Sequence, residues 1–200
     1  MTVKSKAKKG SCRIIGGKWR GRVIKFDDAE GLRPTTDRIR ETVFNWLQPY
    51  VQQSCCLDVF AGSGVLGFEA LSRGGNEVVF IEKNSKTVKK LKENIAVLGA
   101  DSASVQQHDA LDWLGFAGLD ARLEYCLERR FDLVFLDPPF HTHLLAKSCA
   151  LLDSSGCLAD DAIIYVEHAV DEDIVLPERW SCLREKSAGQ VSYKLFERRG

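Results

Sequence analysis

Residues 57–74 read LDVFAGSGVLGFEALSRG, which combines an apolar run, a glycine-rich turn and a run with helical spacing. Gly62, Gly64 and Gly67 match the pattern G-x-G-x-x-G, which joins a strand to a helix in nucleotide-binding α/β proteins. The pattern alone is weak evidence for any one ligand, so the residues around it must identify what binds there. The stretch predicts a parallel sheet with a ligand site at the carboxyl ends of its strands.

Strand-like and helix-like segments alternate along the rest of the chain. Residues 31–51 form a first helix that Thr36 or Asp37 can cap, and residues 115–130 should add another helix. The last two strands are joined by SAGQ alone, so they should pair antiparallel at the sheet edge. The alternation predicts a doubly wound, mostly parallel α/β sheet of seven strands. Strands are expected at 56–60, 77–82, 103–107, 131–137, 162–168, 180–186 and 190–198, and helices at 64–73, 85–98, 110–114 and 143–152.

Three acidic residues at predicted strand ends indicate which ligand the glycine turn binds. Asp58 precedes the turn at a position that is usually apolar in NAD-binding proteins, and an acid there suits the amino group and positive sulfur of S-adenosylmethionine. Glu82 ends the next strand and can accept two hydrogen bonds from ribose hydroxyls. Asp109 ends the third strand, within reach of an adenine amino group. The expected cofactor contacts are Asp58, Phe60, Ala61, Gly62, Ser63, Gly64, Glu82, Lys83, Asp109 and Ala110.

The fourth strand ends in Asp137, Pro138, Pro139 and Phe140, a sequence that a simple turn does not need. An exocyclic amine of a nucleobase is a poor nucleophile because its lone pair is delocalised into the ring. A carboxylate and a proline-fixed carbonyl can each accept one N–H and aim that lone pair at a sulfonium methyl group, so that the rate is gained by orientation. The aromatic ring can stack on a base swung out of its helix. These four residues are the predicted catalytic set.

Composition limits the remaining possibilities. The chain has 200 residues and is 44% apolar, which suits one domain of ordinary size with a real core. The apolar runs are strand-sized, and the basic N-terminus is followed by no apolar signal region, so we expect a cytoplasmic protein. Seven cysteines are present without a Cys-x-x-Cys pair, and no metal site is expected.

Positive charge gathers at the N-terminus. Residues 1–40 contain twelve Lys or Arg and four Asp or Glu, although the formal net charge of the chain is +0. This segregation indicates a polyanionic partner. We expect a disordered basic tail at 1–10, a basic β-hairpin at 11–30 and the main domain at 31–200. Trp19, at the hairpin tip, can either stack on a base or fix the hairpin to the body, and the sequence does not decide between these roles.

Several segments together resemble the RsmD family of 16S ribosomal RNA guanine-N2-methyltransferases from about residue 12 onward. They are RIIGGKWRGRVIKF (13–26), LRPTTDRIRETVFNWL (32–47), the glycine stretch, FIEKN (80–84), LDPPF (136–140) and QVSYKLFERR (190–199). The resemblance implies a seven-stranded sheet with an antiparallel last strand, methylation of one guanine of the small ribosomal subunit or its assembly intermediate, and a hairpin that touches RNA. The implied RNA contacts are Arg13, Lys18, Trp19, Arg20, Arg22, Arg33 and Arg38.

Other functions are compatible with parts of this pattern. An adenine-N6 methyltransferase acting on DNA or RNA can carry the same Asp-Pro-Pro-Phe, but 200 residues leave no room for a separate target-recognition domain. Glutamine methyltransferases favour Asn at the first position of the motif. A ring-carbon methyltransferase would need a Pro-Cys pair, which is missing here. A non-catalytic RNA-binding assembly factor with the same fold is a further alternative, although the acid at Asp137 argues against it. A monomer is the simplest expectation.

Overall fold

The computed structural model describes residues 9–27, 36–115 and 130–200 of the chain. Most of the predicted tail, Arg33 and the predicted 115–130 helix lie outside these ranges. Lys9 and Gly10 were expected in the tail but belong to the first strand of the hairpin. In the described ranges no helix is both long and apolar enough to cross a membrane.

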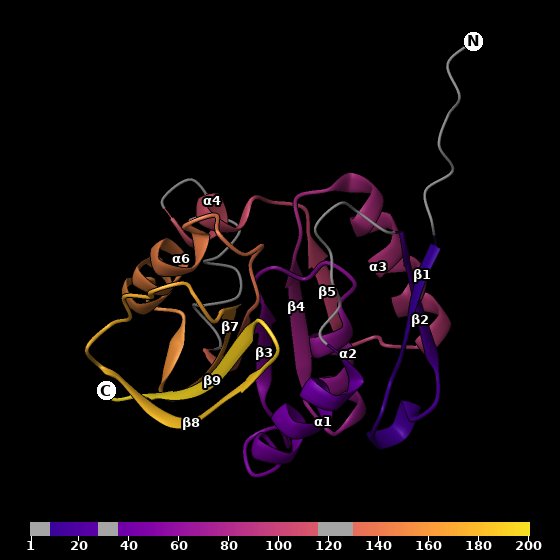
Figure 1. Cartoon of the computed structure of the whole chain (residues 1–200). Helices are drawn as coiled ribbons and strands as arrows, with labels where there is room; N and C mark the ends of the chain where they lie inside the picture. Colours follow the sequence, from indigo (N-terminus) through magenta and orange to yellow (C-terminus); the bar gives the residue numbers. More distant parts are fainter. Residues whose placement is uncertain (1–8, 28–35, 116–129) are drawn as a thin grey trace.

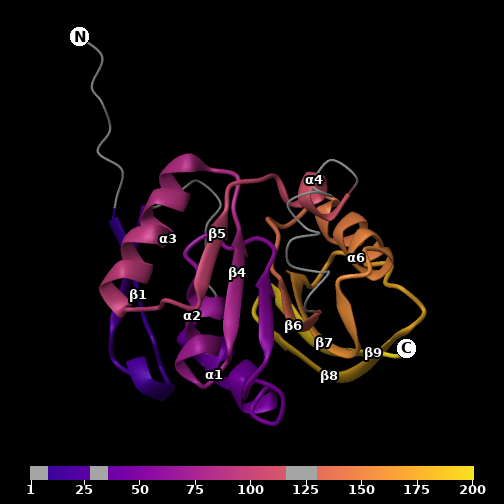
Figure 2. The ribbon, with the colours of Figure 1, turned by 180° about the vertical axis from the view of Figure 1, so that it is seen from behind.

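The central sheet has the order β5-β4-β3-β6-β7-β9-β8 in the described part of the chain (Figures 1 and 2). Strands β3 to β7 are parallel, β9 is antiparallel to β7, and β8 is antiparallel to β9. The predicted seven-stranded, doubly wound sheet is therefore confirmed, and the outermost strand is β8 rather than the last one. The bounds are β3 Cys55–Asp58, β4 Glu77–Ile81, β5 Ala103–Gln106, β6 Phe131–Leu136, β7 Leu158–Ala169, β8 Trp180–Ala188 and β9 Val191–Arg198.

Helices cover both faces of this sheet. On one face lie α1 (Asp37–Trp46), α2 (Val65–Ser72) and α3 (Ser85–Leu98), and on the other lie α4 (Ala110–Leu114) and α6 (Leu144–Ser154). Each face buries its own apolar cluster. Residues 133–136 of strand β6 are all apolar because Leu133 and Phe135 point into one cluster while Val134 and Leu136 point into the other.

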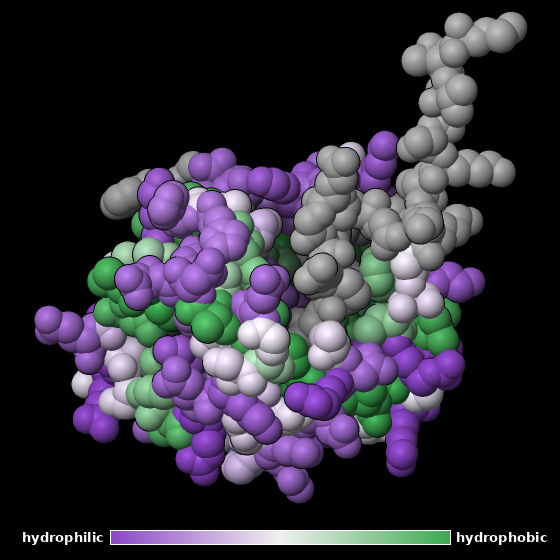
Figure 3. Space-filling view, viewed as in Figure 1, coloured by the Kyte–Doolittle hydropathy of each residue, from purple (hydrophilic) through white to green (hydrophobic). Residues whose placement is uncertain are grey.

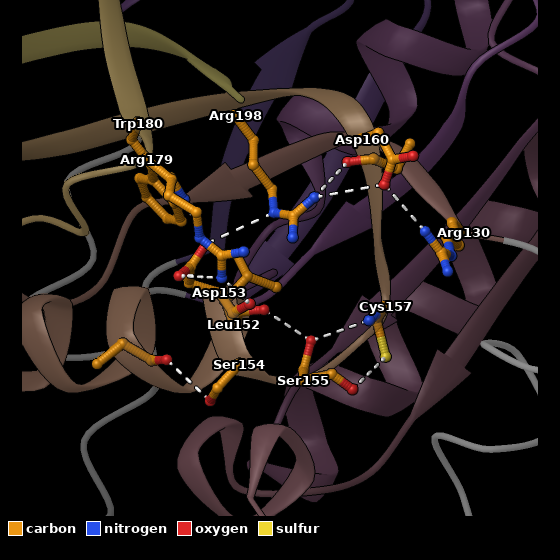
Figure 4. A network of polar contacts seen from close by, with 12 residues as sticks. Arg130, Leu152, Asp153, Ser154, Ser155, Cys157, Asp160, Arg179, Trp180 and Arg198 are labelled. Atoms are coloured by element: carbon orange, nitrogen blue, oxygen red, sulfur yellow. Dashed lines mark hydrogen bonds and ion pairs between the residues drawn. The ribbon is translucent and has the colours of Figure 1, made fainter. Parts of the chain in front are cut away.

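A network of charged side chains fixes the antiparallel end of the sheet to α6 (Figure 4). Asp153, near the end of α6, lies 2.8 Å from Nη2 of Arg179 and 3.5 Å from Nε of Arg198, and accepts a 3.1 Å hydrogen bond from the indole N–H of Trp180. Arg198 also lies 3.7 Å from Asp160. Because these partners come from α6, β7, β8 and β9, the network holds the last two strands in their places.

The N-terminal hairpin forms a small sheet of its own from β1 (Lys9–Arg13) and β2 (Val23–Asp27), joined through the short 3₁₀ turn η1 (Gly17–Trp19). It packs along α3 (Figures 1 and 2). The side-chain amide of Asn94 on α3 accepts a 3.2 Å bond from the Lys25 N–H and donates a 2.9 Å bond to the Lys25 carbonyl. The buried side-chain amide of Asn94 thus pairs with the backbone of strand β2 as a neighbouring strand would.

The tip of the hairpin is docked on the last turn of α2. The hydroxyl of Ser72 donates a 2.5 Å bond to the Gly16 carbonyl and accepts a 2.9 Å bond from the Trp19 N–H. Gly17 has φ +73°, and a Cβ there would lie 1.7 Å from the Ser72 carbonyl oxygen. Only glycine meets both the backbone conformation and the close approach at this point.

Arg40 on α1 is buried, although arginine side chains are mostly exposed. Its side chain is fully buried, 2.6 Å from Asp37 and 3.6 Å from Glu69, and it donates a 3.0 Å bond to the Arg13 carbonyl. Glu69 on α2 also accepts a 2.9 Å bond from the Ile15 N–H. The helical spacing of residues 31–51 could not reveal that a neighbouring element supplies a buried carboxylate.

Candidate active site

The glycine turn after β3 is held between the neighbouring strands. The Val59 N–H donates to the Phe135 carbonyl at 3.1 Å, and the Ala61 N–H donates to the Ile81 carbonyl at 3.0 Å. Gly64 begins α2 with φ +75°, a left-handed conformation that favours glycine. A Cβ at Gly67 would lie 2.4 Å from the Phe80 ring, so this glycine lets α2 pack closely on β4. The glycines therefore shape a tight strand-to-helix turn at the carboxyl edge.

Glu82 lies directly beneath this turn. Its Oε2 atom accepts a 3.1 Å hydrogen bond from the Gly62 N–H, and its Oε1 atom accepts a 2.7 Å bond from the Asn84 N–H. The side chain is half-buried. Two backbone donors thus fix the orientation of the carboxylate, and they leave it at the edge of the turn where ribose hydroxyls were expected to bind.

Asp58 is almost completely buried at the end of β3, with 2% of its surface exposed. Its Oδ2 atom accepts a 3.3 Å hydrogen bond from the Gly67 N–H. Burial raises the pKa of this carboxyl to about 7, the Gly67 N–H opposes the rise, and the negative charge of Glu82 adds to it. A cation beside Asp58 would favour its ionised form, so the environment suits a positively charged group of a ligand.

Asp109 plays a structural part as the N-cap of α4. Its Oδ1 atom accepts a 2.9 Å bond from the Leu111 N–H, and its Oδ2 atom lies 3.7 Å from the ammonium of Lys83. The adjacent Ala110 is buried. Capping uses one carboxylate oxygen and leaves the side chain at the same sheet edge as Glu82, so the position is compatible with a contact to an adenine ring.

Asp137, Pro138, Pro139 and Phe140 follow β6 at this edge. Asp137 and Phe140 are half-buried, Pro138 is buried and Pro139 is exposed. The hydroxyl of Thr142 donates a 2.5 Å bond to the Pro139 carbonyl, which engages that oxygen within the loop. The Pro138 carbonyl is therefore the better candidate for an acceptor of a substrate N–H.

The loop after this motif contains strained backbone that the sequence did not reveal. His141 has φ +57° and His143 has φ +55°, although neither is glycine. Such conformations cost about 1–3 kcal/mol each and often occur at functional sites. Most histidines have negative φ, so the sharp return of the chain after Phe140 could not be predicted from the sequence.

A buried acid beside the motif, Glu167, was also missed. Leu136 pairs with Val166 in the parallel register of β6 and β7, which places Asp137 next to Glu167. Glu167 is 3% exposed, and its Oε2 atom accepts a 2.7 Å bond from the hydroxyl of the fully buried Tyr165. Burial and the charges of Glu167 and Asp137 raise the pKa of Tyr165. The sequence predicted the strand at 162–168 but assigned no role to its polar side chains.

The predicted RNA-contacting residues are not all placed as expected. Lys18, Arg20 and Arg22 are exposed on the hairpin, but Trp19 is only 7% exposed and its ring joins the core, with the Lys18 ammonium 4.3 Å from its centroid. Burial favours the second of the two roles considered for Trp19, that of fixing the hairpin to the body. Arg13 and Arg38 are exposed, and Arg33 lies outside the described residues.

Comparisons with known proteins agree with this architecture. The family model described as "Conserved hypothetical protein 95" matches residues 12–197. The ribosomal RNA small subunit methyltransferase D of Haemophilus influenzae is 46% identical over 191 residues, which cover 94% of this chain and 95% of the relative. A solved structure from Escherichia coli is 46% identical, covers 96% of this chain and 99% of its own, and has a TM-score of 0.81.

A more distant neighbour shares the fold. The Thermus thermophilus 16S rRNA N2 methyltransferase, solved in complex with AdoMet and guanosine, is 20% identical with a TM-score of 0.65. The alignment covers 100% of this chain and 52% of that one. At this identity the likeness supports the fold class alone.

Proposed function

The chain belongs to the ribosomal RNA small subunit methyltransferase D family, and from this premise we propose that it methylates the exocyclic N2 amine of a guanine in 16S ribosomal RNA. The observation that carries the proposal is the meeting of two groups of residues at one edge of the sheet. Glu82 and Asp58 border the glycine turn, and Asp137 follows the adjacent strand β6. Methyl donor and acceptor would thus meet between neighbouring strand ends.

The proposed donor is S-adenosylmethionine, which supplies an electrophilic methyl group on a positive sulfur. Whether this molecule fits the site is judged from the residues around the glycine turn. The buried Asp58 suits the charged methionine end, and Glu82 presents a fixed carboxylate for ribose hydroxyls. Asp109 and Ala110 would lie along the adenine. These residues would hold the molecule at the carboxyl edge, beside the strand end that carries Asp137.

The target amine would be activated by hydrogen bonding. The Asp137 carboxylate and the Pro138 carbonyl would each accept one N–H of the guanine N2 amine, which aligns the nitrogen lone pair with the methyl group. Phe140, which is half-exposed beside them, would stack on the base once it has left its helix or loop. After transfer the methylated amine is strongly acidic, so water can take the proton.

The substrate class follows from the relatives, which are named for the small ribosomal subunit. We propose that the chain acts in the cytoplasm as a monomer, on the assembled subunit or an assembly intermediate. The exposed basic hairpin supports binding to a polyanion.

Methyl transfer from labelled S-adenosylmethionine tests the proposal directly. The substrates are small subunits that lack their natural modifications, naked ribosomal RNA and duplex DNA, each followed by digestion and mass analysis of the labelled nucleoside. Label in N2-methylguanosine of the subunit is expected. Label in N6-methyladenosine, or in its deoxy form, would retain the chemistry assigned to Asp137 but overturn the target. Bound cofactor without transfer to any substrate would favour a non-catalytic assembly factor.

A further inference from the structure

The tip of the hairpin lies at the edge of the sheet opposite to the candidate active site. The backbone N–H of Trp19 is hydrogen-bonded to Ser72, the last residue of α2. Because α2 begins at the glycine turn, Ser72 lies at the opposite end of this helix from the turn. The Arg22 guanidinium donates a 2.8 Å bond to the Val97 carbonyl in the last turn of α3. The basic tip is therefore separated from the carboxyl edge by the length of α3, about 21 Å for fourteen residues.

A row of exposed lysines covers this distance. Lys86, Lys89 and Lys92 are spaced three residues apart on α3 and are all exposed, so they follow one side of the helix from its start toward its last turn. Lys83 precedes the helix at the carboxyl edge. Glu93 is the sole acid among residues 83–98, and it is paired with Lys90 at 2.6 Å. No acidic residue shares the three-residue spacing of these lysines, so the row presents positive charge only.

Charge along the whole chain is segregated in the same way. Residues 83–98 contain five lysines and one acid, and residues 1–40 contain twelve bases and four acids. The rest of the chain, 41–82 and 99–200, has eleven bases and twenty-three acids. The two basic segments are far apart in sequence, yet the bonds of Asn94 to Lys25 and of Arg22 to Val97 join them.

We infer that α3 and the hairpin form one phosphate-binding track, on which the RNA backbone runs from the hairpin tip along Lys86, Lys89 and Lys92 to the carboxyl edge. The inference rests on the proposed function and names a contact surface for its substrate. Lysine ammonium groups bind phosphates as point charges and read no sequence. The track would orient the substrate, while the choice of base is left to the pocket around Asp137. At the right of Figure 3, where the hairpin lies, hydrophilic and apolar surface both appear.

The test neutralises the row without changing the helix. The triple variant Lys86→Gln, Lys89→Gln, Lys92→Gln keeps good helix formers at exposed positions. The matched control, Arg184→Gln, Lys186→Gln, Arg199→Gln, removes the same charge from exposed positions near the opposite side of the sheet. Both are compared with the natural chain for affinity to unmodified small subunits between 50 and 200 mM salt, roughly the range over which phosphate contacts lose most of their strength.

The α3 variant should bind subunits at least about tenfold more weakly at low salt, with a slope of log affinity against log salt that is reduced by about 2. Its kcat at saturating subunit and its affinity for S-adenosylmethionine should remain within about twofold. The control should match the natural chain in all four quantities. An α3 variant whose slope and affinity equal those of the control would overturn the track.

Failure of the proposed function would look different. In that case the natural chain itself would form no N2-methylguanosine, whatever the salt slopes of the variants. Thermal unfolding of both variants verifies that any loss of binding comes with an intact fold. A lower slope in both variants to the same extent would mean that general charge, and not the row on α3, sets the affinity, and this result also overturns the inference.

Discussion

The carboxylate of Glu82 accepts a 3.1 Å hydrogen bond from the Gly62 N–H, which couples the end of β4 to the glycine turn after β3. A second bond from the Asn84 N–H fixes the other oxygen at 2.7 Å. The same carboxylate therefore shapes the turn and faces the position proposed for the ribose. Because Glu82 has both roles, a substitution that removes one of its carboxylate oxygens should disturb the turn as well as the proposed ribose contact.

Replacement of Glu82 by Ala should weaken S-adenosylmethionine binding about 10- to 100-fold, because hydrogen bonds to a charged acceptor contribute about 1.5–3 kcal/mol each. Glu82→Gln retains one acceptor oxygen and should fall between the natural chain and the Ala variant. Isothermal titration calorimetry measures the effect. Glu178→Ala, at an exposed position far along the chain, serves as the control. Unchanged affinity in Glu82→Ala would remove the ribose contact from the proposal.

Asp58 should make the stability of the protein depend on pH. Its folded pKa of about 7 lies above the ordinary value near 4, so the folded state holds a proton that the unfolded state has lost. The stabilising effect of that proton is complete below pH ~4 and is lost as the pH rises to about 7. The expected loss is a few kcal/mol, at about 1.4 kcal/mol for each pKa unit.

The comparison with Asp58→Asn isolates this effect. The variant cannot ionise at this position, so its free energy of unfolding relative to the natural chain should increase between pH 4.5 and pH 8. Urea unfolding at the two pH values gives both numbers. A constant difference would show that Asp58 titrates near its ordinary pKa in the folded state.

Cofactor binding should release a proton from Asp58 when the pH lies below about 7. The positive end of S-adenosylmethionine would favour the ionised carboxylate and lower its pKa. Calorimetry at pH 6 in two buffers of different ionisation enthalpy measures the release, which should approach one proton in the natural chain and be absent in Asp58→Asn. Equal release in both proteins would assign the proton to another group.

Replacement of Asp137 by Ala should leave folding and cofactor affinity unchanged while it reduces methyl transfer by about 10²–10⁴-fold, since it removes the group that orients the amine. Asp137→Asn keeps a carbonyl oxygen that can accept an N–H, so it should lose less. Single-turnover transfer to unmodified small subunits separates chemistry from binding. Near-normal turnover in Asp137→Ala would contradict the catalytic role.

The sequence predicted the sheet well because the signals for it are local. Glycines at a strand-to-helix turn and acids at strand ends have fixed relations to parallel strands, so Gly64, Glu82 and Asp137 could be placed from their order alone. Helix 85–98 was correct at both ends, since Asn84 caps its start and Gly99 adopts φ +63° at its end. Such end signals lie in the residues that directly flank the helix.

Tertiary contacts decided the features that sequence reasoning missed. The burial of Trp19 depends on Ser72, and that of Arg40 depends on Glu69, each far away in sequence. The proximity of Glu167 to Asp137 depends on the register of β6 and β7. A basic residue on a helix is exposed in most cases, so its periodicity could not distinguish Arg40 from Arg38.

The buried pair of Arg40 and Glu69 should hold the hairpin on the body, and removing Arg40 tests this. Arg40→Leu leaves the Glu69 carboxylate buried without one of its cations, which typically costs about 3–5 kcal/mol. Arg38→Leu, on the exposed side of the same helix, should change the unfolding free energy by less than about 0.5 kcal/mol. The double variant Arg40→Leu, Glu69→Leu should recover part of the loss because no unpaired charge remains buried. Urea unfolding of the three variants measures these differences. An Arg40→Leu protein as stable as Arg38→Leu would mean that the apolar contacts of the hairpin and its bonds to Ser72, Asn94 and Val97 hold it without Arg40.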